Sequence, residues 1–160
     1  MVSEIRIREA AIEDAGEAAA AFDEYRMFYG QPSDLAGAEK FLRERLGGQD
    51  SVFFAAVDES SGRIAGFTQL YPTFSSLSMQ RAWILNDLYV RPDYRRQGVA
   101  QALLDRAVAF AASTGAKRLE LATAIDNANA QRLYEKNGFV RDNEFYHYFR
   151  KTQTEAVENG

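Results

Sequence analysis

A cationic turn that contains a glycine stands directly before an amphipathic pattern in residues 95–107, RRQGVAQALLDRA. The first backbone N–H groups of a helix lack intrahelical partners, and the helix dipole places positive charge beside them. A phosphate or pyrophosphate can satisfy both, and Gly98 lacks the Cβ that would hold an anion away. The pattern matches neither a Walker A loop nor a GxGxxG fingerprint. It indicates an anion site, and an ordinary strand–helix loop with solvated arginines is the alternative.

Composition limits the chemistry that such a site could support. The 160 residues hold 19 basic and 23 acidic side chains, a net charge of −4, which argues against nucleic acid as a partner. With no cysteine, and with His147 as its one histidine, the chain cannot build thiolate or two-histidine metal sites. We therefore predict no metal, and proton transfers that use Tyr, Asp, Glu or water. No stretch approaches the roughly 20 apolar residues of a membrane span, and the N-terminus lacks a signal-peptide core, so we predict a cytoplasmic protein with no membrane partner.

Apolar periodicity predicts the elements that would position this turn. Alternation over 5–9 predicts a strand, helical spacing predicts helices over 11–28 and 35–46, and two β-rich runs predict a hairpin around 59–62. The elements expected after these are a buried strand at 81–90, a helix from Gly98 to Thr114, a strand at 118–123, a helix at 127–136 and one or two aromatic strands between 139 and 151. One strand–helix–strand unit demands a parallel pair, so we expect a mixed sheet with helices on both faces. We expect a single domain over 1–151 and a polar, disordered tail over 152–160.

Two motifs carry a resemblance to a known family. Residues 91–100 contain R-x-x-G-x-A, which is similar to the [Q/R]-x-x-G-x-[G/A] motif of the GNAT superfamily of N-acetyltransferases. Residues 127–134, N-x-x-A-x-x-L-Y, followed by EKNGF, resemble the second signature of that family. The resemblance covers residues 5 to about 151. It implies an α+β (α/β) GNAT fold, with a mixed, mostly antiparallel sheet of six or seven strands, splayed at the centre, and about four helices on both faces.

The resemblance also implies acetyl-CoA as the co-substrate. In the family, the turn at 95–100 holds the pyrophosphate through backbone N–H groups, and the strand at 82–90 pairs with the pantetheine arm through its main chain. The residues that this places at the cofactor are Leu88, Tyr89, Val90, Arg95, Arg96, Gln97, Gly98, Val99, Ala100, Gln101, Asn127, Asn129 and Tyr134.

Acetyl transfer to an amine needs a proton donor for the departing thiolate and a neutral amine. Tyr134 is the general acid by family match, and the high reference pKa of a phenol keeps it protonated at pH 7; its alternative is a packed aromatic on a helix face. Asn86 aligns with a glutamate of polyamine acetyltransferases, but an amide cannot accept the proton. Asp87 points to the other face of a regular strand, unless a bulge turns it inward. The base is therefore Asp87, an ordered water or none, with capture of a neutral amine; we favour water.

Aromatic residues in loops indicate a pocket for the acceptor. The residues expected to bind it are Tyr29, Tyr71, Phe74, Trp83 and Asp87, with Glu24 or Asp34 available to receive a cation. We predict a small primary amine, a polyamine, diamine or amino-acid-like molecule, that attacks directly in a ternary complex. The chain looks most similar to the diamine and polyamine acetyltransferase branch.

Two other functions stay open at this point. A protein lysine or N-terminal acetyltransferase needs an open groove, whereas aromatic loops at 28–31 and 71–78 indicate closure. A non-catalytic acetyl-CoA sensor fits Asn86 but does not need Tyr134. By resemblance, and because 139–149 would form an apolar sheet edge, we also expect a homodimer.

Overall fold

The computed structural model describes residues 4–153 and consists of two compact units that divide between Ala122 and Thr123. The N-terminal unit contains the sheet and three α-helices, and the C-terminal unit contains one α-helix. The prediction of one domain over 1–151 stays a prediction. Most of the predicted tail, 152–160, lies outside the described residues.

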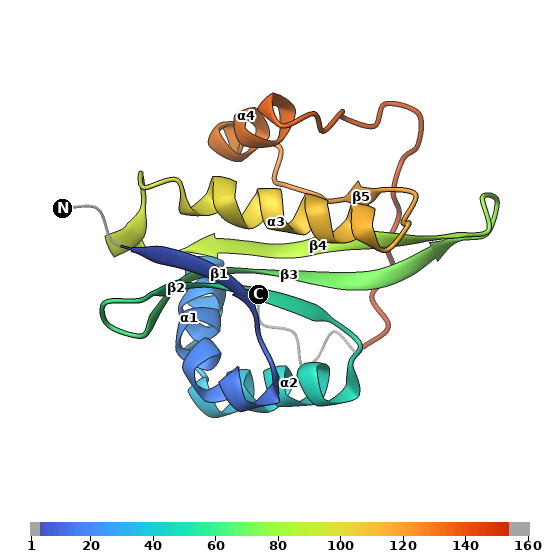
Figure 1. Ribbon diagram of the computed structural model, residues 1–160. Helices are drawn as coiled ribbons and strands as arrows, with labels where there is room; N and C mark the ends of the chain where they lie inside the picture. The colour runs from blue at the N-terminus through green and yellow to red at the C-terminus, as the bar shows by residue number, and fades with distance from the viewer. Residues whose placement is uncertain (1–3, 154–160) are drawn as a thin grey trace. The chain divides into compact units, whose positions relative to one another are not determined.

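The sheet of the N-terminal unit is mixed, as predicted (Figure 1). Its strands are β1 (Ile5–Glu9), β2 (Val52–Asp58), β3 (Arg63–Ser75), β4 (Gln80–Val90) and β5 (Leu119–Glu120), in that spatial order. The first four pair antiparallel, and β5 joins β4 in parallel through the pairs Trp83–Leu119 and Ile84–Glu120. The predicted parallel strand–helix–strand unit is thereby confirmed.

Helices cover both faces of this sheet (Figure 1). On one face lie α1 (Ala15–Phe28) and α2 (Leu35–Gly48), and on the other lies α3 (Val99–Ser113). Short 3-10 helices, η1 (Ile12–Asp14) and η2 (Pro92–Tyr94), precede α1 and α3. Among residues 4–153, no helix is long and apolar enough to cross a membrane.

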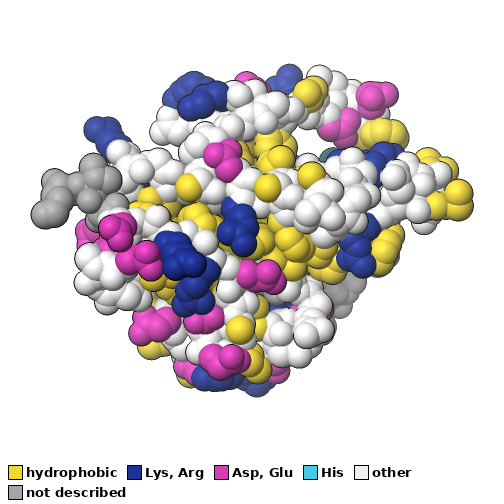
Figure 2. Space-filling view, in the orientation of Figure 1, with side chains coloured by type: hydrophobic (Ala, Val, Ile, Leu, Met, Phe, Trp, Pro, Cys, Tyr) yellow, Lys and Arg dark blue, Asp and Glu magenta, His cyan; other side chains and the backbone are white. Residues whose placement is uncertain are grey.

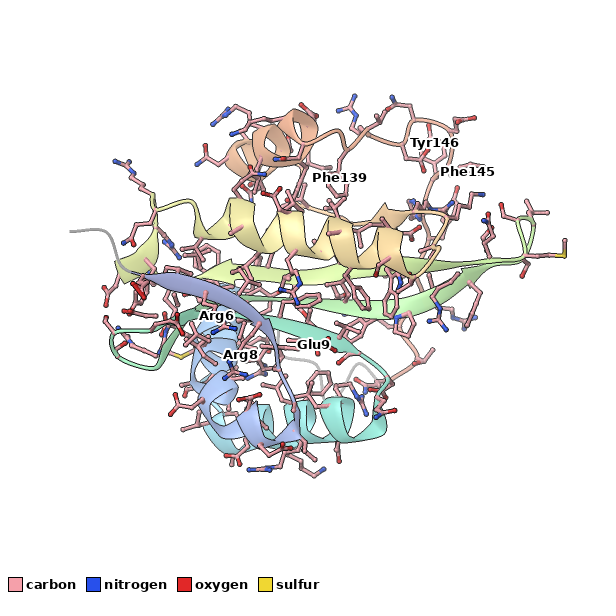
Figure 3. The ribbon with its side chains drawn as sticks, viewed as in Figure 1. Arg6, Arg8, Glu9, Phe139, Phe145 and Tyr146 are labelled. Atoms are coloured by element: carbon pink, nitrogen blue, oxygen red, sulfur yellow. The ribbon has the colours of Figure 1, made fainter. Side chains whose placement is uncertain are left out.

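Polar side chains accept hydrogen bonds from backbone N–H groups at the starts of η1 and α2. The Asp14 carboxylate accepts hydrogen bonds from both terminal nitrogens of Arg8, which Figure 3 labels on β1, and from the backbone N–H of Ala11. Asp34 accepts the N–H of Gly37 and so caps α2. These contacts use the unpaired N–H groups that the start of a helix presents.

The core has a layer on each face of the sheet. Between the sheet and α1–α2, the Phe53 and Phe67 rings stack 5.0 Å apart and Phe22 lies 6.0 Å from Phe67. Under α3, Phe110 contacts Phe54 at 5.5 Å and Trp83 at 5.0 Å. Successive side chains of a strand therefore serve opposite layers, as the pleat requires. On the face drawn in Figure 2, basic and acidic side chains are interspersed, in keeping with the small net charge.

The prediction of six or seven strands is wrong for the described chain, which has five. The strand predicted at 118–123 shortens to Leu119–Glu120, and no strand forms between 139 and 151 in the part that the structure describes. Aromatic alternation supplies β-propensity, but a strand also needs a partner for its backbone. Here Asp142 instead accepts the N–H of Glu144, a local turn contact that competes with a ladder.

Candidate active site

β4 holds one residue more than its partner strand at its centre. Gln69 pairs with Asp87 and the next residue, Leu70, pairs with Leu85, so Asn86 has no partner. This is a β-bulge. In a regular strand Leu85 and Asp87 would point to the same face, and the extra residue sends them to opposite faces. The inward turn considered for Asp87 is thus present.

Contacts identify the two faces. Trp83, two residues before Leu85, packs on Phe110 of α3. Asp87 instead meets α1, because the Tyr25 hydroxyl donates a hydrogen bond of 2.7 Å to Asp87 Oδ1. The bulge therefore places a carboxylate on the α1 face of the sheet.

Asp87 is 6% exposed and accepts hydrogen bonds from neutral groups alone among the described residues. Besides Tyr25, the donors are Gln69 Nε2, 3.0 Å from Oδ2, and Asn86 Nδ2, 3.2 Å from Oδ1. In the part of the chain that the structure describes, no lysine or arginine lies within 4.0 Å of this carboxylate. A buried negative charge without a counterion favours the approach of a cation.

Two phenols around Asp87 are held neutral. Burial, followed by the nearby charge of Asp87, raises the pKa of Tyr25 far above its usual range. The same two causes raise the pKa of Tyr71 to about 12. The Tyr25 ring is fixed by Tyr29 at 5.2 Å and Phe67 at 5.5 Å. Both hydroxyls therefore keep their protons at pH 7, and that of Tyr25 donates to Asp87.

Gln69 leaves one buried acceptor unused. The residue is fully buried, and its Oε1 has no hydrogen-bond partner among the described residues, while its Nε2 donates to Asp87. Leaving such an atom unsatisfied costs about 1–3 kcal/mol. An N–H group of a bound molecule, or a water, would remove that cost.

The turn before α3 has the backbone form that an anion site needs. Arg96 (φ 63°) and Gly98 (φ 77°) both adopt left-handed conformations, and Gly98 is the N-cap of α3. A Cβ added at Gly98 would meet no atom within 4 Å. Because the N-cap of α3 is this glycine, no N-cap side chain accepts a hydrogen bond from the first N–H groups of the helix. Such a turn directs successive N–H groups toward one concave side. The residues present thus fit a pyrophosphate.

The two arginines of this turn differ. Arg95 Nε donates to the Val90 carbonyl at 3.0 Å, and its guanidinium lies 5.8 Å from the Phe28 and Tyr89 ring centres. Arg96 is exposed and makes no ion pair or side-chain hydrogen bond with the described residues. Arg96 is therefore the cation available to an anion, whereas Arg95 braces the turn.

The other polar side chains of the turn point along the chain. Gln97 Nε2 donates to the Asp93 carbonyl, and Gln101 Nε2 donates to Asp105 one helical turn later. Val99, the first residue of α3, is buried, and Ala100 is half-buried. That 97–101 contact the cofactor stays a prediction, and the side-chain partners of Gln97 and Gln101 leave the backbone as the part that it concerns.

Within the N-terminal unit, no described strand pairs with the outer edge of β4 over its second half. β5 pairs with Trp83 and Ile84, so Leu88, Tyr89 and Val90 lie beyond the last β5 pair. The Tyr89 side chain points away from this edge, and its hydroxyl donates to Glu24 at 3.1 Å. Unpaired main-chain groups at such an edge can pair with an extended ligand.

The C-terminal unit carries the second motif, on α4 (Ala128–Lys136). Asn127 is the N-cap, and its Oδ1 accepts the Ala130 N–H at 3.1 Å. Asn129 accepts a hydrogen bond from Arg132. The Tyr134 ring contacts the Phe139 ring, labelled in Figure 3, at 5.8 Å between centres. Within this unit, the two asparagines thus act in helix capping and in a side-chain pair.

The residues predicted to bind the acceptor divide between two faces of the sheet. Tyr29 and Tyr71 belong to the Asp87 surroundings through Tyr25. Phe74 and Trp83 lie on either side of the Arg81 guanidinium, 5.0 and 5.3 Å away. Trp83 Nε1 also donates to Thr114 at the end of α3. The structure therefore groups Tyr29, Tyr71 and Asp87, and it does not bring Phe74 or Trp83 to them.

The carboxylates suggested for a cation are both engaged elsewhere. Glu24 Oε2 accepts hydrogen bonds from Nε and Nη2 of Arg91, each at 3.1 Å, and Asp34 caps α2. Among the carboxylates considered for a cation, Asp87 is the one without a cationic partner within 4.0 Å in the described chain. No group of three or more His, Asp or Glu side chains that could hold a metal occurs within 4–153, and the expectation of a metal-free site stays a prediction.

Residues 18–139 match the Acetyltransferase (GNAT) family. The chain belongs to the GNAT acetyltransferase family. It is an acetyl-CoA-dependent N-acetyltransferase of that family.

Two relatives and one solved structure are similar to this GNAT enzyme over two thirds of its length or more. It is 49% identical over 144 residues to the uncharacterized N-acetyltransferase YhfO of Bacillus subtilis (strain 168), which covers 90% of this chain and 95% of that protein. It is 31% identical over 107 residues to L-ornithine N5-acetyltransferase NATA1 of Arabidopsis thaliana, or 67% of this chain and 41% of that one. A crystal structure of a probable acetyltransferase, 44% identical, superposes with a TM-score of 0.88 over 93% of this chain and 99% of that chain.

Two residues of the site escaped the sequence interpretation. Tyr25 lies inside the first predicted helix, and Gln69 lies in an apolar strand, FTQLY. A fully buried glutamine in a strand of large apolar residues is a signal in itself, because it needs partners for its amide. Its partner, Asp87, became visible only with the register of β3 and β4.

Proposed function

We propose that this GNAT enzyme acetylates the primary amine of a small molecule, a polyamine, diamine or amino-acid-like compound, and that Asp87 receives the positive charge of that amine. The observation that carries the proposal is the buried Asp87 carboxylate, which has neutral donors and no counterion within 4.0 Å in the described chain. The unused Gln69 Oε1 beside it supplies an acceptor for an ammonium N–H. The name of the ornithine-acetylating relative supports an acceptor of this size and charge.

Acetyl-CoA supplies an acetyl group activated as a thioester. The backbone around Gly98 at the start of α3, with the Arg96 guanidinium, would hold its pyrophosphate. The edge of β4 beyond its last pair with β5 would pair with its pantetheine arm through Leu88 and the Val90 N–H, since the Val90 carbonyl already accepts from Arg95. The left-handed turn and the missing β5 partner support these assignments.

Direct attack in a ternary complex starting from the bound ammonium needs three proton movements. The ammonium first gives one proton to a water held by Asp87, which frees the lone pair of the nitrogen. The new C–N bond then forms as the C–S bond breaks; a second proton leaves the nitrogen through the same water to solvent, and one proton reaches the thiolate sulfur. Asn86 cannot take either amine proton, because its amide is not basic. By match to the family motif, Tyr134 donates the proton that reaches the sulfur.

Thiol release from acetyl-CoA against spermidine, short diamines, amino acids and a lysine peptide tests this function. We expect turnover on one class of small amine, and at least about a tenfold loss of kcat with Tyr134→Phe, because general acid catalysis contributes about 10²–10⁴-fold. Turnover on the lysine peptide alone would make the enzyme a protein acetyltransferase. Binding of acetyl-CoA with no turnover on any amine would favour a sensor.

We also propose a homodimer in the cytoplasm. Exposed aromatic side chains after α4 support a buried partner surface: Phe145, Tyr146, Tyr148 and Phe149. Figure 3 labels the first two. A monomer at micromolar concentration in sedimentation would contradict the dimer.

A further inference from the structure

A hydrogen bond between two buried side chains ties the anion turn to a distant hairpin. Tyr94 ends η2, two residues before the left-handed Arg96, and its hydroxyl donates to Asp58 Oδ2 at 2.7 Å. Asp58 closes β2, and both residues are 6% exposed. The bond thus links the end of β2 to a buried residue that lies two positions before Arg96.

Asp58 is itself held rigidly. Its Oδ1 accepts the Ser60 hydroxyl at 2.7 Å and the Ser60 N–H at 3.1 Å, and its carbonyl accepts the Gly62 N–H at 2.7 Å. The Ser60 hydroxyl, followed by the Tyr94 hydroxyl, holds the pKa of Asp58 below its usual range. The carboxylate is therefore charged at pH 7 and fixed within the β2–β3 turn.

Three further contacts fasten η2 and its N-cap, Arg91, to β3. Arg63 Nη1 donates to Asp93 Oδ2 at 3.2 Å, and its guanidinium lies 5.8 Å from the Tyr94 ring centre. The Arg91 N–H donates to the Ala65 carbonyl at 2.8 Å. All these contacts precede Arg96, whose left-handed backbone is disfavoured for a residue with a side chain and needs support from its surroundings.

We propose that Asp58 and Tyr94 are positioning residues for the nucleotide half of acetyl-CoA: their hydrogen bond holds the Arg96–Gly98 turn in its anion-binding form. The proposal rests on the proposed role of that turn. Neither side chain is accessible to the cofactor, since both are buried, so their effect passes through the backbone of the turn.

Tyr94→Phe tests the brace, because it removes the hydroxyl and keeps the ring. We expect the Kd for CoA, measured by calorimetry, and the KM for acetyl-CoA to rise about fivefold, as the loss of one hydrogen bond allows, with kcat unchanged. S-acetylpantetheine, which lacks the pyrophosphate and the nucleotide, separates the brace from a general loss of structure. Its kcat/KM should be equal in wild type and Tyr94→Phe, whereas a merely structural role would lower the activity on both thioesters.

Two more variants complete the design. Asp58→Ala removes both acceptor oxygens. It should raise the Kd for CoA and the KM for acetyl-CoA and spare the kcat/KM for S-acetylpantetheine, so the proposal stays testable if Tyr94→Phe folds poorly. Asp34→Ala, which removes the cap of α2, controls for a loss of stability and should leave the Kd for CoA unchanged. If wild type binds CoA and both brace variants bind it within about twofold, a difference too small for one lost hydrogen bond, the brace is overturned and the proposed function stands. If wild type itself does not bind CoA, the proposed function fails first.

Discussion

The surroundings of Asp87 distinguish it from the other buried carboxylates of the described chain. Most buried carboxylates in this protein have a structural partner: Asp23 accepts the Ser33 hydroxyl and the Asp34 N–H, and Asp58 accepts Tyr94 and Ser60. Asp87 accepts comparable bonds but stands beside an acceptor, Gln69 Oε1, that has none of its own. The pair therefore attracts donors that carry charge.

The Asp87→Asn variant should lose affinity for the amine and keep affinity for CoA. We expect the KM for the best amine to rise about tenfold or more, because a hydrogen bond to a charged group contributes about 1.5–3 kcal/mol. Steady-state kinetics with the amine varied, beside calorimetry with CoA, measures both. Thr114→Val, which removes the hydrogen bond to Trp83 on the α3 face, is the matched control. An unchanged amine KM would remove Asp87 from the acceptor site.

At the scale of elements, periodicity predicted most of the N-terminal unit. The helices over 35–46 and from Gly98, and the hairpin around 59–62, form close to their predicted bounds, because their apolar spacing and caps agree with their packing. From the sequence, a bulge in this strand is one option, but its position at Asn86 cannot be derived. The register of two paired strands depends on contacts between residues far apart in the chain. For the same reason Phe74 and Trp83 were grouped with Asp87, and the sheet separates them.

Close approach of two strands makes Gly66 necessary. A Cβ added there would lie 2.6 Å from the Tyr89 carbonyl oxygen, a backbone atom that cannot move aside alone. We expect Gly66→Ala to lower the free energy of unfolding by about 1–3 kcal/mol. Gly16→Ala on α1, where an added Cβ meets nothing within 4 Å, should instead raise it by about 0.5 kcal/mol. Urea denaturation compares the two, and equal effects would contradict the steric argument.

For the whole molecule, the two half-buried phenols near Asp87 predict how stability depends on alkaline pH. Tyr25 and Tyr71 have folded-state pKa values above the value near 10 of an unfolded chain, the second at about 12. The unfolded state releases these protons first, so their contribution to stability is complete below about pH 10 and is lost as pH rises above it. Absorbance at 295 nm with circular dichroism should show these phenols ionising together with unfolding. Tyr71→Phe should make the alkaline decline shallower, and ionisation of both phenols in a folded chain would contradict the burial.

The bulge also bears on how this chain tolerates insertion and loss of residues in evolution. β4 carries one residue, Asn86, that the ladder with β3 does not use. Its deletion would leave every other pair in register and every side chain on its present face, whereas a deletion inside the regular stretches on either side would turn the residues beyond it over. Lineages can therefore gain or lose a residue at this position with the sheet intact. The kinked backbone beside Asp87 is thus a feature that one codon can add or remove.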